Sequence, residues 1–310
     1  MRNSYLFAVG ALLTLTAGFV SCKTNSVDPS SPNYSANDDS LKAYVARTPR
    51  LAGGTLTNTG LYYKITTANP TGKQVLANEQ VELTYKLYDF KNNLLDSTVA
   101  GRYTYFVVGY TGFNAGVDQG LRVMHEGESA TFLVPAYLGY GNQPYTFIPA
   151  SNPSITITLP PYSILRYEIR VNRSRSERQQ INEYIAANKL PNVDSTASGL
   201  RFIPTLTKPT GATVAAGQTI AVRYVVSTLF PPAVKDSSGT KPYVFVLGQS
   251  GNISGFQEGV SKMRVGEKAT VIFPSSSGYG TQGATNPQTG AYVIAPLTPI
   301  RYDLEVVSAQ

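Results

Sequence analysis

Two stretches of this 310-residue chain decide its fold: GFNAGVDQGLRVMHEGESATFLVP at residues 112–135 and NISGFQEGVSKMRVGEKATVIFP at residues 252–274. An offset of 139 positions aligns them and superimposes two helix-spaced glycines, a methionine, a Gly-Glu pair and the closing proline. Matches in so long a register do not arise by chance. The chain therefore contains one structural unit written twice.

The repeat extends outward from these stretches in both directions. The same offset aligns Tyr85 with Tyr224 and the Gly-Tyr-Gly turn at 139–141 with the one at 278–280. The last strands align at an offset of 135 instead, so the first copy carries a longer loop before its last strand. Loops tolerate such differences in length.

Within each copy the apolar pattern is mainly that of β-strands. Apolar and polar residues alternate at 81–87 and 220–226, whereas residues 117–124 carry apolar side chains at helical spacing. Short helical patterns around Tyr44 and Tyr184 precede the two copies. We therefore predict an α+β fold with two domains. Each is an antiparallel sheet wrapped around one short helix and preceded by a short helical segment.

The chain begins with the features of a secretory signal. Arg2 supplies a positive charge, residues 5–20 form a mainly apolar run, and the single cysteine, Cys22, follows that run. The run is shorter than the roughly 20 residues that a membrane-spanning helix needs. Residues 19–22 resemble the lipobox of bacterial lipoproteins, although Phe19 stands where that motif usually has leucine. An ordinary cleaved signal with an incidental cysteine is the alternative.

These observations predict five segments along the chain. They are a lipoprotein signal at 1–22 with Cys22 as its lipid-attachment residue, a flexible tether at 23–37, a first domain with its leading helix at 38–171, a linker helix at 172–198 and a second domain at 199–310. The tether is rich in Ser, Pro and Asn and has little to bury. We expect an extracytoplasmic protein anchored by lipid to a bacterial membrane, at the outer membrane or the periplasmic face.

The composition excludes several kinds of chemistry. The 26 Lys and Arg exceed the 19 Asp and Glu, but no block of like charge exists, so we expect no nucleic-acid partner. The one histidine, His125, lies in the turn between Met124 and Gly127, and the one cysteine is assigned to the lipid, so we expect neither a His-based catalytic triad nor a His/Cys zinc site. We therefore expect no metal and no cofactor. What the sequence offers instead is aromatic residues in a predicted sheet, in a chain with 21 tyrosines.

In combination, the motifs of both copies resemble the FKBP family of peptidyl-prolyl cis-trans isomerases, over residues 60–171 and 199–308. The second copy has, in the family's order, RYVVS, KDSSG, PYVFVLG, the stretch at 252–274, GYG and VIAPLTPIRYDLEV. The first copy has TYKLYD, LLDST, YFVVG, the stretch at 112–135, GYG and TLPPYSILRYEI. The resemblance implies the FKBP fold and isomerase activity on X-Pro bonds.

The resemblance also implies a pocket in each copy. In the second copy it implies the catalytic residues Tyr224, Asp236, Phe256, Tyr279 and Tyr302 and the substrate-binding residues Tyr243, Phe245, Ile253 and Ile294. In the first copy it implies a pocket of Tyr85, Leu95, Asp96, Phe106, Val117, Tyr140, Leu159 and Tyr167. The two strand tyrosines would orient the aspartates, and the N–H of Ile253 would anchor the substrate. The alternative for each residue is an ordinary place in the core.

Two positions depart from the family pattern in both copies. The tryptophan that usually floors the pocket is Phe256 in the second copy and only Val117 in the first. The residue before the aspartate, usually aromatic, is Lys235 in the second copy and Leu95 in the first. Both changes loosen the pocket, and the first copy is affected more.

The first copy has further changes. Asn114 and Thr104 stand where the second copy has Ile253 and Tyr243, and the loop at 143–158 is placed to gate or block the first pocket. We therefore predict that the second copy is the active isomerase. The first copy is predicted to be weakened and to hold peptides.

The expected chemistry needs no proton or nucleophile, because the barrier of roughly 18–20 kcal/mol to X-Pro rotation comes from amide resonance. An apolar aromatic pocket that excludes water favours the twisted state. The expected partners are unfolded or Pro-containing polypeptides, on which the protein acts as a folding catalyst. The main alternative is a non-catalytic peptide-binding chaperone or scaffold lipoprotein. A glycan-binding lipoprotein is a third alternative, and only the tyrosine content supports it.

Overall fold

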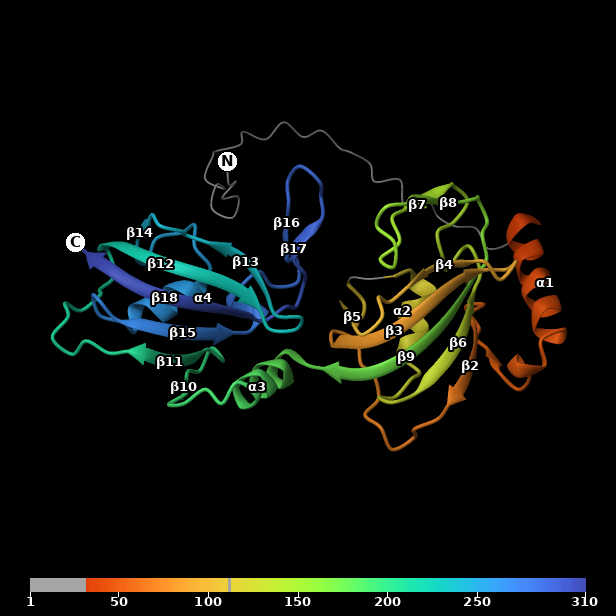
Figure 1. The fold of residues 1–310 in the computed structure, drawn as a ribbon, viewed down its shortest axis with the longest axis horizontal. Coiled ribbons are helices and arrows are strands. Elements are labelled where there is room, and N and C mark those ends of the chain that lie inside the picture. The colour runs from red at the N-terminus through yellow and green to blue at the C-terminus, as the bar shows by residue number, and fades with distance from the viewer. Residues whose placement is uncertain (1–31, 111–112) are drawn as a thin grey trace. The chain divides into compact units, whose positions relative to one another are not determined.

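The computed structural model describes residues 32–110 and 113–310 (Figure 1). The predicted signal at 1–22, with Cys22, and the first part of the predicted tether lie outside the described residues. The described part forms two domains, one ending at Ser174 and the other beginning at Arg175. Each contains an antiparallel sheet and one short helix packed on it, so the predicted α+β class is confirmed.

The first domain has a seven-stranded sheet and, apart from it, a two-stranded hairpin. Its elements are α1 (Pro32–Ala46), the 3-10 turn η1 (Pro49–Leu51), β1 (Thr55–Leu56), β2 (Tyr62–Thr67), β3 (Gln80–Asp89), β4 (Leu94–Ser97), β5 (Thr104–Val107), α2 (Ala115–Leu121), β6 (Ser129–Val134), β7 (Tyr145–Phe147), β8 (Ile157–Leu159) and β9 (Leu165–Arg175). The strand order is β1-β2-β6-β9-β3-β4, with β5 also paired to β3, while β7 and β8 form the hairpin.

The second domain repeats this plan. Its elements are α3 (Glu177–Ala187), β10 (Asp194–Ser195), β11 (Arg201–Leu206), β12 (Thr219–Thr228), β13 (Ala233–Ser237), β14 (Tyr243–Val246), α4 (Ser254–Ser261), β15 (Lys268–Phe273), the 3-10 turn η2 (Ser275–Ser277), β16 (Ala284–Thr285), β17 (Tyr292–Ile294) and β18 (Ile300–Ala309). The order β10-β11-β15-β18-β12-β13, with β14 on β12, matches the first sheet strand for strand.

The two deciding stretches place the short helix directly on the inner face of each sheet. A Cβ added at Gly116 would lie 2.5 Å from the side chain of Val134, and one at Gly255 would lie 2.5 Å from Phe273. Both distances are shorter than any ordinary carbon contact, so a larger residue would push the helix off the sheet. Close helix–sheet packing therefore explains the glycines that the two copies share.

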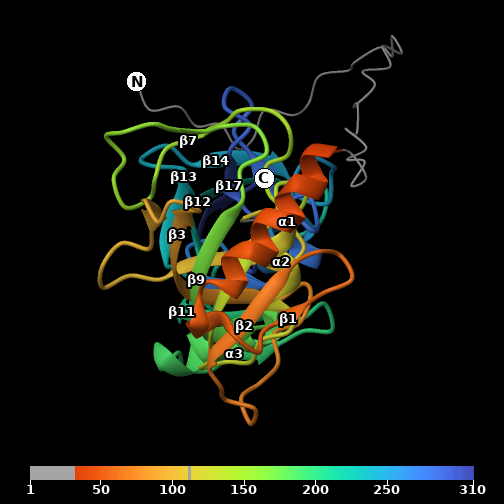
Figure 2. The same ribbon diagram turned by 90° about the vertical axis from the view of Figure 1, so that its right-hand side faces the viewer.

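The helix α1 covers part of the outer face of the first sheet, on the side away from α2 (Figure 2). Leu41 and Tyr44 pack there against Tyr62 of β2 and Leu133 of β6. The two neighbours of Leu133 in β6 belong to the inner core instead, as alternation along a strand requires. Each face of the sheet therefore has its own apolar cluster.

The prediction of a flexible tether is wrong for residues 32–37, which form the first turns of α1. Tyr34 is buried, and its ring meets that of Tyr162 edge-on at 5.2 Å. The side chain of Asn37 accepts a hydrogen bond from the main-chain N–H of Ala136 at 2.8 Å and donates one to the carbonyl oxygen of Tyr162 at 3.1 Å. These tertiary contacts, and not an apolar pattern, hold a polar sequence in a helix.

The predicted linker helix is α3, which packs as a leading helix on the second domain. A capping box begins this helix, because the Ser176 hydroxyl accepts from the Gln179 N–H and the Gln179 side chain accepts from the Ser176 N–H. Ile181 and Tyr184 pack against buried residues of β11 and β15. Residues 172–175, which we predicted as linker, continue β9 instead.

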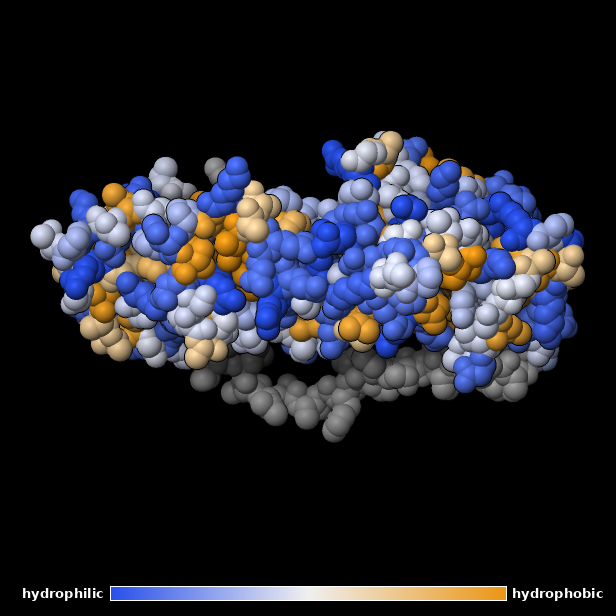
Figure 3. Space-filling model, turned by 90° about the horizontal axis from the view of Figure 1, so that it is seen from below, coloured by the Kyte–Doolittle hydropathy of each residue, from blue (hydrophilic) through white to orange (hydrophobic). Residues whose placement is uncertain are grey.

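The molecular surface carries apolar groups in small numbers. Figure 3 shows a face on which hydrophilic and apolar side chains alternate. Exposed apolar residues such as Ile148 and Val234 lie in loops or short strands. No helix within residues 32–110 and 113–310 is long and apolar enough to cross a membrane.

Glu128, in the turn before β6, couples the stability of the first domain to pH. Its carboxylate accepts hydrogen bonds from the main-chain N–H groups of Asn69 at 3.0 Å and His125 at 2.8 Å. Burial by itself would raise the pKa of Glu128, but these hydrogen bonds outweigh it, and the pKa lies below its usual value. The folded state therefore favours the ionised carboxylate.

We expect Glu128→Gln to lower the free energy of unfolding at neutral pH. We also expect the free energy of unfolding of this variant to fall less steeply as the pH is lowered. The contribution of a carboxylate with a lowered pKa is fully present above its unfolded pKa of about 4.3 and is lost as the pH falls through the folded pKa. Urea unfolding of both proteins between about pH 7 and pH 3 measures this. A difference between wild type and variant that stays constant over that range would contradict the expectation.

Candidate active sites

The second domain gathers five aromatic rings on the inner face of its sheet, a group we call the second aromatic site. Strand β12 supplies Tyr224, β14 supplies Tyr243 and Phe245, α4 supplies Phe256, and β18 supplies Tyr302. Alternation along the strands directs these side chains to the face that carries α4. The structure thus brings together residues that the sequence predicted from four separate segments.

Phe256 forms the base of the second aromatic site. It is fully buried, and its ring centroid lies 5.2 Å from that of Phe245, 5.4 Å from that of Tyr302 and 6.3 Å from those of Tyr224 and Tyr243. The rings are tilted or edge-on to one another, which aromatic pairs favour. A phenyl ring therefore stands at the predicted floor position.

Asp236 of β13 lies at the rim of this site and is half-buried. The Tyr224 hydroxyl donates to its Oδ2 at 2.7 Å. No other group among the described residues donates a hydrogen bond to this carboxylate. Burial raises the pKa of Tyr224 well above its usual value, and the hydrogen bond and charge of Asp236 raise it further. The Tyr224 hydroxyl therefore stays protonated, and as a hydrogen-bond donor it holds the carboxylate in place.

Three more predicted residues complete the rim. Ile253 is the N-cap residue of α4, Tyr279 comes from the Gly-Tyr-Gly turn, and Ile294 ends β17. Ile294 is buried, whereas Ile253 and Tyr279 are half-buried and pack against the same core as Phe256. Burial raises the pKa of Tyr279, so its hydroxyl also remains a donor.

The first domain fills the corresponding space with a residue that the sequence analysis missed. Phe113 immediately precedes the N-cap of α2. Its ring centroid lies 4.7 Å from that of Tyr85, 5.4 Å from that of Phe106 and 5.7 Å from that of Tyr167, edge-on in each case. A protein side chain thus lies among the rings that would surround a bound proline.

Phe113 replaces the ring that the helix lacks. Val117, which aligns with Phe256, is buried but has no ring, while Phe113 aligns with the polar Asn252 of the second domain. A ring has therefore moved from the helix to the loop before it. Comparing the two copies one position at a time would have revealed the paired loss and gain.

Asn114 brings a polar side chain into the first site, as the sequence predicted. Its Oδ1 accepts from the N–H of Val117 at 3.1 Å and caps α2, while its Nδ2 donates to the hydroxyl of Tyr167 at 2.9 Å. Burial raises the pKa of Tyr167 well above its usual value. The amide group therefore ties the helix start to the last strand at the floor of the site.

The longer loop of the first domain folds over its site. Tyr145 of β7 stacks on Tyr140 with ring centroids 3.8 Å apart and planes 9° apart. From the same loop, Ser151 donates to Oδ1 of Asp96 through its main-chain N–H at 3.1 Å and its hydroxyl at 3.0 Å. The loop at 143–158 therefore covers the first site, which was one of the two outcomes expected for it.

Hydrogen bonds from the domain itself consequently use the carboxylate oxygens of Asp96 more fully than those of Asp236. In addition to Ser151, the donors to Asp96 are the hydroxyl of Tyr85 at 2.5 Å and the N–H of Ser97 at 2.8 Å. Four hydrogen bonds use the acceptor capacity of the carboxylate, and the side chain is buried. A peptide would have to displace part of this network to reach it.

The remaining predicted residues of the first site lie where expected. Leu95 is half-buried in β4 and Leu159 is buried at the end of β8, both packed in the core that contains Val117. Thr104 shares a hydrogen bond of 3.2 Å with Thr98. Within the part of the chain that the structure describes, no three His, Cys, Asp or Glu side chains are placed to hold a metal ion.

Several proteins with similar sequences are named as peptidyl-prolyl cis-trans isomerases. FKBP53 of Arabidopsis thaliana, a peptidyl-prolyl cis-trans isomerase, is 32% identical over 126 residues, which are 38% of this chain and 25% of the relative. Human FKBP9 is 26% identical over 231 residues, 71% of this chain and 34% of the relative. FPR2 of Saccharomyces cerevisiae is 35% identical over 96 residues, 30% of this chain and 67% of the relative.

The chain thus spans about a quarter of the length of the plant relative and about a third of that of the human one. The sequence pattern of the FKBP-type peptidyl-prolyl cis-trans isomerase family matches it twice, at residues 72–172 and 211–307. These segments make up more than half of the chain and coincide with the two domains. With its repeated sheet, helix and aromatic site, the chain belongs to the FKBP-type peptidyl-prolyl cis-trans isomerase family and carries that family's domain twice.

Proposed function

We propose that the second domain catalyses cis-trans isomerisation of X-Pro bonds and that the first domain does not turn over substrate. The observation that carries this is the difference between the two aspartates. Within residues 32–110 and 113–310, the half-buried Asp236 accepts one hydrogen bond, from Tyr224, whereas the buried Asp96 accepts four. Phe113 also lies among the rings of the first site.

The proposed mechanism requires only binding and shape. A proline ring packs on Phe256 and between the tyrosines, and burial of the X-Pro bond removes the water that stabilises the planar, charge-separated amide. The barrier to be lowered is roughly 18–20 kcal/mol in water. Contacts that form only with the twisted bond raise the rate, and no group has to transfer a proton.

Three polar groups orient the peptide in this proposal. The N–H of Ile253 binds a substrate carbonyl, and the half-buried Tyr279 hydroxyl donates to a second one. The carboxylate of Asp236, held by Tyr224, faces the carbonyl that precedes proline and rotates with the bond. Tyr243 donates to Oδ1 of Asn252 at 3.1 Å, which fixes its ring at the mouth of the site.

The test is the cis-to-trans relaxation of a short Leu-Pro peptide in the presence of the full chain. Faster relaxation, in proportion to protein concentration, is expected. If the chain does not accelerate relaxation but still suppresses aggregation of an unfolded client, it is the non-catalytic chaperone instead. The self-occupied site of the first domain is the observation that favours this second function.

The proposed setting is extracytoplasmic, with the protein tethered to a bacterial membrane by lipid on Cys22 and acting as a folding catalyst on Pro-containing polypeptides there. Its support is the sequence alone: a positive residue, an apolar run and a single cysteine at the end of that run. An acyl chain supplies about 0.8 kcal/mol per buried CH₂, so several acyl chains hold a protein firmly.

Cys22→Ser is expected to move the protein from the membrane fraction to the soluble fraction and to abolish labelling by radioactive palmitate. Ser26→Ala, four residues further along, is the matched control and should change neither result. Fractionation and labelling of both variants in a bacterial host measure this. Membrane attachment that survives Cys22→Ser would show that another feature anchors the chain.

A further inference from the structure

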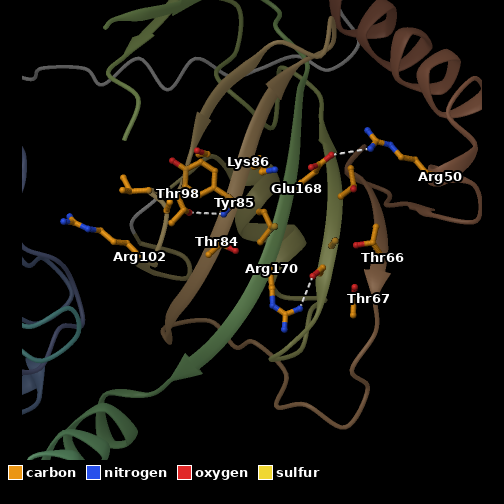
Figure 4. A pocket seen from close by; sticks show the side chains of 18 of the residues that line it. Arg50, Thr66, Thr67, Thr84, Tyr85, Lys86, Thr98, Arg102, Glu168 and Arg170 are labelled. Carbon is orange, nitrogen blue, oxygen red and sulfur yellow. Dashed lines mark hydrogen bonds and ion pairs between the residues drawn. The ribbon is translucent and has the colours of Figure 1, made fainter. Parts of the chain in front are cut away.

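The outer face of the first sheet carries a groove that isomerase chemistry does not use. It has a volume of about 590 Å³ and lies across β2, β6, β9 and β3, bounded by η1 and the loop between β4 and β5 (Figure 4). Alternation along β3 separates it from the aromatic site: Tyr85 reaches Asp96 on the inner side, while Thr84 and Lys86 face the groove.

Hydroxyl groups and cations line this groove. The hydroxyl residues are Thr66, Thr67, Thr84, Ser97, Thr98, Ser129 and Thr131. The cations are Arg50, Lys86, Arg102 and Arg170, drawn in Figure 4, and Glu168 is the single acidic residue among those that line it. Hydroxyl groups and cations are both donors, so the groove presents hydrogen-bond donors and positive charge to a ligand.

Most of the positive charge has no acidic partner. The one carboxylate, Glu168, is already used by Arg50 at 3.6 Å and by Arg166 beneath it. Lys86, Arg102 and Arg170 are exposed and form no ion pair within residues 32–110 and 113–310. Arg170 only reaches the Ser129 hydroxyl, at 3.5 Å. Three cations are thus available to a ligand.

The second domain has the same groove in a neutralised form. It measures about 420 Å³ and also lies over the outer face of its sheet. There Glu305 lies 3.5 Å from Arg223 and 3.6 Å from Lys268, and Asp303 lies 2.7 Å from Arg301. Side-chain carboxylates of the domain itself therefore satisfy the cations of this groove.

At one aligned position the two grooves carry side chains of opposite charge. Arg170 of β9 aligns with Glu305 of β18, so the first groove carries a guanidinium where the second carries the carboxylate that joins two cations. In addition, Lys86 aligns with the uncharged Val225. In the first groove, Thr84 and Ser129 stand where the second has Arg223 and Lys268, and Glu168 is the one carboxylate among the described residues that line it. The first groove therefore lacks the carboxylate of Glu305 and carries Lys86 and Arg170 as cations that the second groove does not have.

We propose that this groove of the first domain binds a carboxylate-rich segment of a polypeptide, with Lys86, Arg102 and Arg170 as its charged contacts. The second domain indicates the chemistry, because carboxylates fill the equivalent surface there. Among the described lining residues the one aromatic ring, that of Tyr85, is engaged by Asp96 on the inner side. The groove accordingly offers no platform on which a sugar or a nucleobase stacks.

The experiment measures binding of a fluorescent twelve-residue peptide of alternating Glu and Ser to the full chain, by anisotropy at low salt. The peptide lacks proline, so the aromatic sites do not bind it as substrate. We expect binding that weakens with salt, because the contacts are exposed. The same peptide with Gln in place of Glu is expected not to bind.

In the variant Lys86→Glu with Arg170→Glu, the change at 170 introduces the carboxylate that the second domain has at Glu305, and the change at 86 reverses a second charge. The variant is expected to weaken binding about tenfold or more. The matched control, Lys91→Glu with Lys241→Glu, makes the same change in net charge at exposed sites outside the groove and is expected to stay within about twofold. Thermal unfolding of each variant establishes that it is folded.

Three results would overturn the proposal. They are equal binding of the Glu and Gln peptides, equal loss of binding in the groove variant and its control, and displacement of the peptide by heparin or phosphatidylglycerol vesicles at concentrations far below those needed for unlabelled peptide. The last result would assign the groove to another class of anion. None of these measurements depends on isomerase activity.

Discussion

Asp236→Asn in the full chain will slow catalysed cis-to-trans relaxation about tenfold or more, which corresponds to about 1.4 kcal/mol or more in barrier height relative to wild type. Asp96→Asn will leave the rate within about twofold of wild type. The physical reason is access. Asp236 is half-buried at the rim and, among the described residues, accepts a hydrogen bond only from Tyr224, whereas Ser151, Ser97 and Tyr85 all donate to Asp96.

This pair of variants makes one change at two equivalent positions, so each serves as the control for the other. Asparagine keeps the size of the side chain and removes its charge. Unfolding curves establish that both variants are folded before rates are compared. Equal losses in the two variants would mean that both domains turn over substrate. A loss confined to Asp96→Asn would reverse the assignment of the active domain.

Phe256→Ala will lower the free energy of unfolding of the second domain by about 3–5 kcal/mol, the usual cost of deleting a fully buried phenyl ring. Phe256 is 0% exposed and lies within 6.3 Å, centroid to centroid, of four other rings. Removing it leaves a cavity at the floor of the site. The helix α4 has little freedom to move into that cavity, because it already lies in direct contact with β15 at the neighbouring Gly255.

Chemical denaturation of the full chain measures this, and Phe113→Ala is its counterpart in the first domain. Phe113 is half-buried on a loop, so its removal is expected to cost less than removal of Phe256. We also expect Phe113→Ala to open the first site and to strengthen its binding of a proline-containing peptide, which a fluorescent peptide measures. A loss of stability for Phe256→Ala below about 1 kcal/mol would show that Phe256 does not form the floor of a packed site.

Several features of this protein follow from the sequence alone. The duplication, the strand pattern and the single helix of each domain were all predicted, because the spacing of glycines and apolar residues is itself set by close packing of helix on sheet. Gly116 and Gly255 show this, since any larger residue there would collide with β6 or β15. The aromatic members of the second site were predicted from the resemblance of the sequence motifs to a known family.

Other features required the tertiary structure. The helix at 32–37 is held by Tyr34 and Asn37, whose partners lie about a hundred residues further along the chain, so a local pattern of polar residues pointed to a tether. The filling of the first site by Phe113 was missed because that ring enters from a neighbouring position. Likewise, local sequence does not show that Arg170 and Lys86, far apart in the chain, share one groove.

The duplication is therefore determined by the sequence, whereas the difference between the two aspartates is determined by the fold. Sequence spacing determines which residues face inward, because that depends only on the period of a strand or helix. Whether an inward-facing aspartate is available or already hydrogen-bonded depends on where a distant loop comes to rest. For Asp96 that loop delivers Ser151, and for Asp236 none of the described residues takes its place.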